Sequence, residues 1–195
     1  MTRTQIINEL IKKYDYKSFL EIGVDTGFNR RFVNCKEYVG VDPNAATPAT
    51  HHMTSDEYFF TNTRKFDIIF VDGLHEAEQV YRDIKNALKH LNEGGTIVCH
   101  DMSPIQEIHQ RVPRVTQIWN GDCWKALVQL RTEHNNLEIL TVDTDWGCGV
   151  IRKGKQPKLK VIEPLTYENL EINRKKWLNL ISVDEFVNKF NLTKH

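Results

Sequence analysis

The stretch FLEIGVDTG, residues 19–27, decides the fold that we predict for this chain. It reads as a short apolar strand that contains a carboxylate, Glu21, and ends in a tight turn between Gly23 and Gly27. Nineteen residues after Gly23, Asp42 closes a second apolar strand, YVGVD. A strand, a glycine turn and an acidic residue about 20 positions further on are typical of a Rossmann-type unit that holds a nucleoside-bearing cofactor. Glycines also occur in turns that bind nothing, so the chemistry of this turn matters.

The side chains of the turn indicate which cofactor fits. A dinucleotide-binding turn reads G-x-G-x-x-G, and its second glycine lets backbone amides approach a pyrophosphate. Here Asp25 stands at that place, and Glu21 lies just ahead. Two carboxylates repel a pyrophosphate but suit a cofactor that carries an ammonium and a sulfonium group. We therefore expect S-adenosylmethionine rather than NAD, with Asp42 accepting hydrogen bonds from the ribose hydroxyls. The cofactor-binding residues predicted here are Glu21, Gly23, Asp25, Gly27 and Asp42.

The size and charge of the chain favour one globular domain that binds neither nucleic acid nor membranes. Its 195 residues suffice for one domain with a substantial core, but not for two full ones. Basic and acidic residues balance at 26 each, so no bulk charge attracts nucleic acid or anionic lipid. No apolar run reaches the ~20 residues that span a bilayer, and the cysteines form no C-x-x-C pair. We expect a cytoplasmic protein with reduced thiols; whether it is a homo-oligomer stays open.

Strand and helix signals alternate along the first part of the chain, which is the pattern of a parallel α/β sheet. Apolar residues at helical spacing predict a leading helix in residues 1–14 and another in residues 75–91, capped by a left-handed Gly94. Continuous apolar runs predict buried strands that end near Asp72 and Asp101.

The second part of the chain is predicted to be more varied. Residues 102–120 contain two prolines and read as an irregular segment or lid. A helix near residues 120–134 and an antiparallel hairpin that turns at Asp145 should follow. Further helices are predicted near residues 166–178 and 182–190. We expect an α/β, Rossmann-like fold of the class I methyltransferase type: a seven-stranded, mostly parallel sheet with a C-terminal antiparallel hairpin and helices on both faces. Residues 1–152 would form the cofactor-binding domain, and residues 153–195 a helical extension of it.

A second group of polar residues follows two of the predicted strands. Asp72 ends one buried strand, and His100 and Asp101 end the next. Neighbouring strands lie under ~5 Å apart, so these groups can converge on one ion. Carboxylates suit Mg²⁺, and a histidine ligand shifts the preference towards Mn²⁺. We expect Asp72, His100 and Asp101 to bind a divalent metal, provided that the strand ends before His100, because adjacent strand residues point to opposite faces. The alternative interpretation is that the two aspartates cap loops and that the histidines are incidental.

His75 follows Asp72 by three residues, at the start of the next helix. An alcohol is a poor nucleophile, and it gains from a metal that stabilises the alkoxide and from a base that removes the proton. The unperturbed pKa of histidine, about 6.5, suits that base at neutral pH. We therefore predict His75 as the catalytic base.

The segment VDGLHEAEQVYRDI…LNEGGTIVCHD resembles the D-G-x-H…G-G…H/E-D pattern of class I S-adenosylmethionine-dependent methyltransferases, closest to the macrocin O-methyltransferase-like branch. That branch includes sugar and natural-product O-methyltransferases, and the resemblance covers roughly residues 18–152. It implies that Asp72 and Asp101 bind the metal and that His75 is the base. His100 stands where some members have a glutamate ligand. Catechol-type enzymes have a lysine at the place of His75, so the histidine favours a non-phenolic hydroxyl.

Other candidate residues have two interpretations each. Ser55 and Asp56 either contact the adenine or belong to a helix cap in T-S-D-E. Trp119, Asp122 and Trp124 lie in or beside the lid, where aromatic rings either stack on a sugar or pack in the core.

Two rival functions remain to be weighed. An amino or nucleic-acid base methyltransferase usually carries an N/D-P-P-Y/F motif, where this chain has VDGLH. A non-catalytic cofactor-binding module would need no base, which the set of Asp72, His75 and Asp101 supplies. The function that the sequence favours is methylation of a hydroxyl on a small molecule, a sugar or a natural product, with help from a divalent metal.

Overall fold

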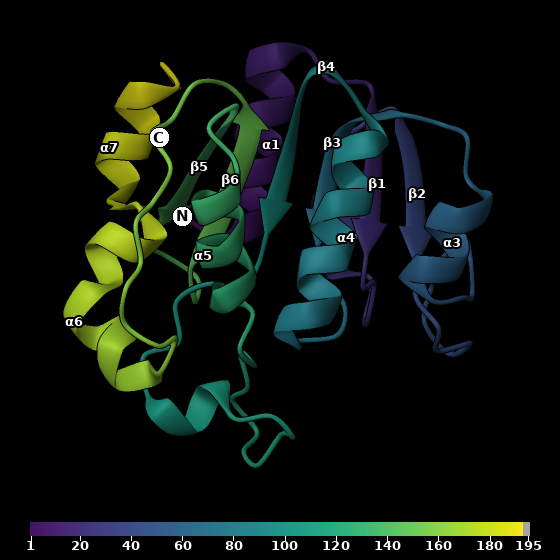
Figure 1. Cartoon of the computed structure of the whole chain (residues 1–195). Coiled ribbons are helices and arrows are strands. Elements are labelled where there is room, and N and C mark those ends of the chain that lie inside the picture. The colour runs from purple at the N-terminus through teal and green to yellow at the C-terminus, as the bar shows by residue number, and fades with distance from the viewer. Residues whose placement is uncertain (193–195) are drawn as a thin grey trace.

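The structure is a computed structural model that describes residues 1–192, built around a seven-stranded sheet (Figure 1). Its strands are β1 (Ser18–Ile22), β2 (Glu37–Val41), β3 (Phe66–Val71), β4 (Leu91–Cys99), β5 (Leu137–Val142), β6 (Cys148–Lys153) and β7 (Leu180–Ile181). Its helices are α1 (Arg3–Tyr14), α2 (Phe28–Phe32), α3 (Ser55–Thr61), α4 (Ala77–Lys89), α5 (Trp124–Glu133), α6 (Tyr167–Leu178) and α7 (Val183–Lys189). A short 3₁₀ helix, Glu107–Gln110, lies between β4 and α5.

The strand order is β2, β1, β3, β4, β6, β5, β7. The first four are parallel neighbours, and β6 runs antiparallel to both β4 and β5. The predicted Rossmann-like methyltransferase fold with its antiparallel hairpin is confirmed. The seventh strand was not located from the sequence: β7 comes from the tail, between α6 and α7, and pairs parallel with β5. The tail after residue 153 therefore contributes a strand to the sheet as well as the two predicted helices.

Helices cover both faces of the sheet, because successive apolar side chains of its strands point to opposite faces. In β3, Ile69 and Val71 pack with α3, α4 and α5, whereas Ile68 and Phe70 pack with α1 and α7. Each of these four side chains is at most 1% exposed, and burying one contributes about 1.5–3 kcal/mol. The core thus holds the carboxyl ends of β1 to β4 at one edge.

The boundaries of α4 differ from the predicted range. The helix begins at Ala77, so His75 lies in the loop before it, and it ends at Lys89. Gly94 has a φ of +76°, which is left-handed as predicted, but it lies within β4. The prediction that Gly94 caps this helix is wrong; His90 occupies the C-cap position.

None of the helices in residues 1–192 is long and apolar enough to cross a membrane. The four cysteines, all within this range, are free, and Cys99 is fully buried in the core.

Candidate active site

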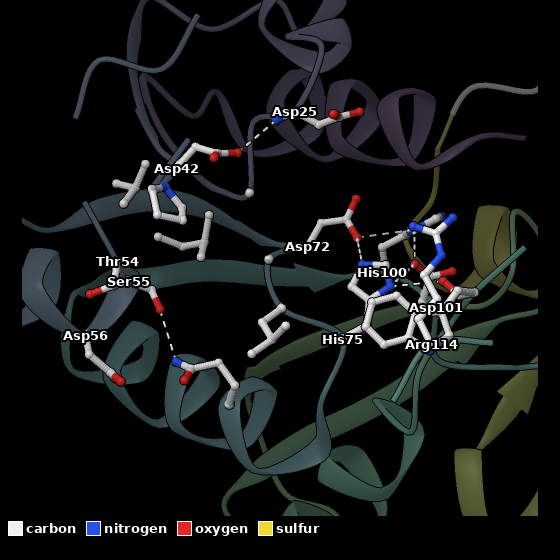
Figure 2. Close-up of a pocket in the computed structure, with 18 of the residues that line it drawn as sticks. Asp25, Asp42, Thr54, Ser55, Asp56, Asp72, His75, His100, Asp101 and Arg114 are labelled. Carbon is white, nitrogen blue, oxygen red and sulfur yellow. Dashed lines mark hydrogen bonds and ion pairs between the residues drawn. The ribbon is translucent and has the colours of Figure 1, made fainter. Parts of the chain in front are cut away.

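A cavity of about 750 Å³ opens where β1, β2, β3 and β4 end. Its volume is in the range of small-molecule sites. Figure 2 shows Asp25 and Asp42 on one side, Ser55 and Asp56 at one end, and a cluster around His100 at the other. The predicted site residues that line the cavity are Gly23, Asp25, Asp42, Ser55, Asp56, Asp72, His75, His100 and Asp101. The predicted residues Glu21 and Gly27 are not among the lining residues.

The glycine turn after β1 is held in place by Asp42. One carboxylate oxygen of Asp42 accepts hydrogen bonds from the backbone amides of Val24 and Asp25, each at 3.0 Å, and the other accepts one from Asn44 at 2.9 Å. At Gly23 a Cβ atom would lie 2.0 Å from the carbonyl oxygen of Asp72, so only glycine allows this close approach. Asp42 therefore shapes the turn in addition to facing the cavity.

Glu21 lies beneath the turn and is 1% exposed. Its carboxylate accepts hydrogen bonds from the hydroxyl of Tyr38 at 2.6 Å and from the side-chain amide of Asn29 at 3.0 Å. Burial raises the pKa of Glu21 to about 7, against the lowering effect of these two bonds. The negative charge that the turn presents to the cavity is therefore that of Asp25.

In the T-S-D-E segment, one residue caps the helix and two others line the cavity. Thr54 caps α3 in a capping box with Glu57, so the cap does not use Ser55 or Asp56. Both of these residues line the cavity. The hydroxyl of Ser55 accepts a hydrogen bond from Gln79 at 3.1 Å.

At the other end of the cavity, two histidines contact the same two aspartates. His75 Nε2 lies 3.3 Å from Asp72 Oδ1, and His75 Nδ1 lies 3.4 Å from Asp101 Oδ2. His100 Nδ1 lies 3.5 Å from Asp72 Oδ1 and 3.1 Å from Asp101 Oδ2. β4 ends at Cys99 and Asp101 has a φ of +63°, so His100 and Asp101 reach the same point, as the metal prediction required.

The short distances shift the protonation of this cluster. Burial would raise the pKa of Asp72, but the charge and hydrogen bond of His100, together with His75, lower it to about 2. Burial lowers the pKa values of both histidines, but the aspartates outweigh it. The pKa of His75 is raised, and that of His100 is raised well above its usual value. Without a bound cation, the imidazoles thus favour their charged forms.

The donor set fits a divalent metal. Asp72, His75 and Asp101 offer ligand atoms within 4.8 Å of one another, and His100 contacts the same two carboxylates. Oxygen and imidazole ligands suit Mg²⁺, Mn²⁺ and other first-row metals. A second group within the described residues joins His100 to Asp145 and Cys148. Burial raises the pKa of the Cys148 thiol to about 12, which disfavours the thiolate that a metal binds.

The predicted lid covers this end of the cavity. Trp119 stacks on the ring of His75 with centroids 5.2 Å apart, and its backbone oxygen lies 3.1 Å from His75 Nδ1. The other two candidates have structural roles. Trp124 is buried and stacks on Trp177 in the core, and Asp122 accepts a hydrogen bond from the backbone amide of Ala77 at 2.7 Å.

Sequence reasoning missed Arg3 and Asp145. Arg3 lines the cavity, and its Nη1 lies 3.2 Å from Asp145 Oδ2 and 3.4 Å from His100 Nε2. The backbone amide of Arg3 also donates to Asp145 Oδ2 at 2.8 Å. Arg3 and Asp145 are 142 positions apart in the sequence, so no local sequence pattern predicts that the start of α1 contacts the hairpin turn.

The comparisons with known proteins agree with the fold. A family model described as a methyltransferase domain matches residues 20–102, and no curated protein matches the chain. The O-methyltransferase TomG from Streptomyces achromogenes, solved with S-adenosylmethionine, superposes with a TM-score of 0.61 at 13% identity over 77% of this chain and 79% of that chain. The O-methyltransferase from Bacillus cereus, solved with S-adenosylhomocysteine, gives 0.54 at 14% identity over 77% and 80%. The S-adenosylhomocysteine-bound methyltransferase PaMTH1 from Podospora anserina gives 0.54 at 17% identity over 78% of each chain. The chain has the fold of the class I methyltransferases, and the matched domain model supports a methyltransferase.

Proposed function

We propose that this chain is an S-adenosylmethionine-dependent O-methyltransferase that methylates a hydroxyl of a small molecule, a sugar or a natural product, with the help of a divalent metal. The observation that carries the proposal is the cavity at the carboxyl ends of β1 to β4. It joins the glycine turn and Asp42 to the cluster of Asp72, His75, His100 and Asp101. A module that only bound a nucleoside would have no use for two histidines held between two aspartates at its other end.

The cofactor would lie along the cavity from Ser55 to Asp72. Ser55 and Asp56 would contact the adenine, and Asp42 would accept hydrogen bonds from the ribose hydroxyls with the lone pairs that its backbone contacts leave free. Asp25 supplies negative charge near the turn, which favours a cationic ligand. S-adenosylmethionine supplies an electrophilic methyl group on a positively charged sulfur.

His75 would take the proton from the acceptor hydroxyl at Nε2. Its Nδ1 faces two acceptors, the carbonyl oxygen of Trp119 at 3.1 Å and Asp101 Oδ2 at 3.4 Å, and its Nε2 faces Asp72 Oδ1 at 3.3 Å. A metal bound to the two aspartates would take up their charge and leave the Trp119 carbonyl as the acceptor that holds the proton on Nδ1. Nε2 would then be the basic atom, and stacking on Trp119 orients the ring.

Asp72, His100 and Asp101 would hold the divalent metal, Mg²⁺ or Mn²⁺. Such an ion stabilises negative charge on the acceptor oxygen. Its charge would also lower the pKa values of both imidazoles, which favours the neutral form that a base and a ligand need.

Calorimetry with S-adenosylhomocysteine and with NAD tests the cofactor assignment. We expect micromolar binding of S-adenosylhomocysteine and none of NAD. Asp42→Asn keeps the shape of the side chain but removes its charge, and it should weaken binding by about 1–3 kcal/mol. Binding of NAD without S-adenosylhomocysteine would show that the charge of Asp25 does not select the cofactor.

A further inference from the structure

We propose that Arg3 binds the carboxylate of the amino-acid part of S-adenosylmethionine. The proposal rests on the function proposed above and adds a residue from the N-terminal helix to the cofactor site. Arg3 is the first residue of α1, and it lines the cavity beside Asp72.

The position of Arg3 is fixed by contacts on both sides of its backbone. Its own amide donates to Asp145, and the hydroxyl of Thr4 donates to Asn29 at 2.6 Å. Thr2 caps α1 in a capping box with Gln5. The first turn of the helix is therefore anchored, so the guanidinium is held at the cavity.

One side of the Arg3 guanidinium donates hydrogen bonds within the protein, and on the other side Nε donates none. Nη1 contacts Asp145 and His100. Within residues 1–192, Nε is buried and has no hydrogen-bond partner, and the nearest carboxylate oxygen, Asp72 Oδ2, lies 4.0 Å from it. Nε and Nη2 carry the two parallel N–H groups that bind both oxygens of one carboxylate. A buried donor without a partner is costly, so this edge is suited to a ligand.

The charges around that edge match an α-amino acid. Arg3 Nε lies 4.0 Å from Asp72 Oδ2, while Asp72 Oδ1 faces the two histidines. A zwitterionic amino acid carries its carboxylate and its ammonium on the same carbon atom. The carboxylate would bind Arg3 and the ammonium would bind Asp72 Oδ2, which pairs each charge with its opposite.

The other guanidinium at the cavity is not available in the same way. Arg114 Nε donates to the carbonyl oxygen of Thr116 at 2.8 Å, and its Nη2 donates to that of Gln117 at 2.6 Å. Both members of its N–H pair are thus used by the lid itself. Arg114 serves as a matched control, because it also lines the cavity and carries the same charge.

The test compares S-adenosylhomocysteine with its decarboxylated analogue, which keeps the adenosine, the thioether and the ammonium. Calorimetry on the full chain should show that the wild type prefers S-adenosylhomocysteine by roughly 10- to 100-fold. Arg3→Gln should lose that preference by weakening only the binding of S-adenosylhomocysteine, whereas Arg114→Gln should keep it. Arg3→Lys retains the charge but not the parallel N–H pair, so it should lose most of the preference for S-adenosylhomocysteine. It provides a second test of the proposal in case the Gln variant misfolds.

Two results would overturn the assignment. An Arg3→Gln variant that binds both ligands more weakly by the same factor would show that Arg3 acts only through the shape of the site. An Arg3→Gln variant with the wild-type affinity for both ligands would place the carboxylate elsewhere. If the wild type binds neither ligand, the proposed function fails first, and that result is separate from both of these.

Discussion

His75 lies where it could act either as a metal ligand or as the catalytic base. It belongs to the same cluster of potential ligand atoms as Asp72 and Asp101, yet it is also the residue that we propose as the base. A metal ligand cannot use the same nitrogen to accept a proton, so metal affinity and turnover separate the two roles.

We predict that His75→Ala lowers turnover by roughly 10²–10⁴-fold and leaves the affinity for S-adenosylhomocysteine nearly unchanged. Mn²⁺ binding, followed by electron paramagnetic resonance in the presence of S-adenosylhomocysteine, should persist in this variant and weaken strongly in His100→Ala. The opposite pattern, with Mn²⁺ lost from His75→Ala and kept in His100→Ala, would make His75 the ligand. Full activity in excess EDTA on an identified acceptor would remove the metal from the mechanism.

Glu21 gives a prediction about stability rather than activity. The folded state raises the pKa of this carboxyl from 4.5 to about 7, so between these values the folded protein keeps a proton that the unfolded chain has lost. The free energy of unfolding should therefore fall as pH rises through this window, by ~3 kcal/mol from this group. Glu21→Gln carries no such proton and removes that fall.

Urea denaturation of both proteins at about pH 5 and about pH 8 measures the effect. Titration of the histidines and of Asp72 occurs in both proteins and cancels in the difference. The wild type should lose ~2–3 kcal/mol more than Glu21→Gln across this range. Identical pH dependence in the two proteins would mean that Glu21 is ionised in the fold.

At the scale of the elements, what sequence reasoning could and could not predict follows from the range of the contacts. The strands around FLEIGVDTG, KFDIIFVDG and GGTIVCHD were predictable because their apolar runs are local. β7 was not, because a two-residue strand has no periodicity of its own and forms only by pairing with β5. The start of α4 was also predicted at the wrong residue, because the side chain that caps this helix comes from a distant part of the sequence.

That distant cap can be tested. Glu76, at the N-cap position of α4, supplies no side-chain hydrogen bond, whereas Asp122 accepts one from the amide of Ala77 at 2.7 Å. Asp122→Ala should lower the free energy of unfolding by about 1 kcal/mol, within the usual range of 0.5–2 kcal/mol for an N-cap. Thermal denaturation measures this, with Lys125→Met as the control that removes the ion pair of Asp122 and keeps its hydrogen bond to Ala77. Equal losses in the two variants would assign the effect to the ion pair.

At the scale of the whole molecule, the fold and the sheet edge that carries the site were predictable from the sequence. The contact of Arg3 and Asp145 beside that site was not. The rule that ligands bind beyond the carboxyl ends of parallel strands brought Asp42, Asp72 and Asp101 together. Arg3 and Asp145 are 142 positions apart, and only the packing of α1 against the hairpin turn brings them together beside the cavity. No local pattern marks such a contact.

We propose that one cavity binds S-adenosylmethionine along the ends of β1 to β3 and presents its methyl group to the histidine cluster. A crystal structure of the chain with S-adenosylhomocysteine would show where the ligand lies. We predict adenine beside Ser55 and Asp56, ribose hydroxyls on Asp42, and the sulfur between Gly23 and His75. Density for the ligand in another place, or with its sulfur turned away from His75, would contradict it.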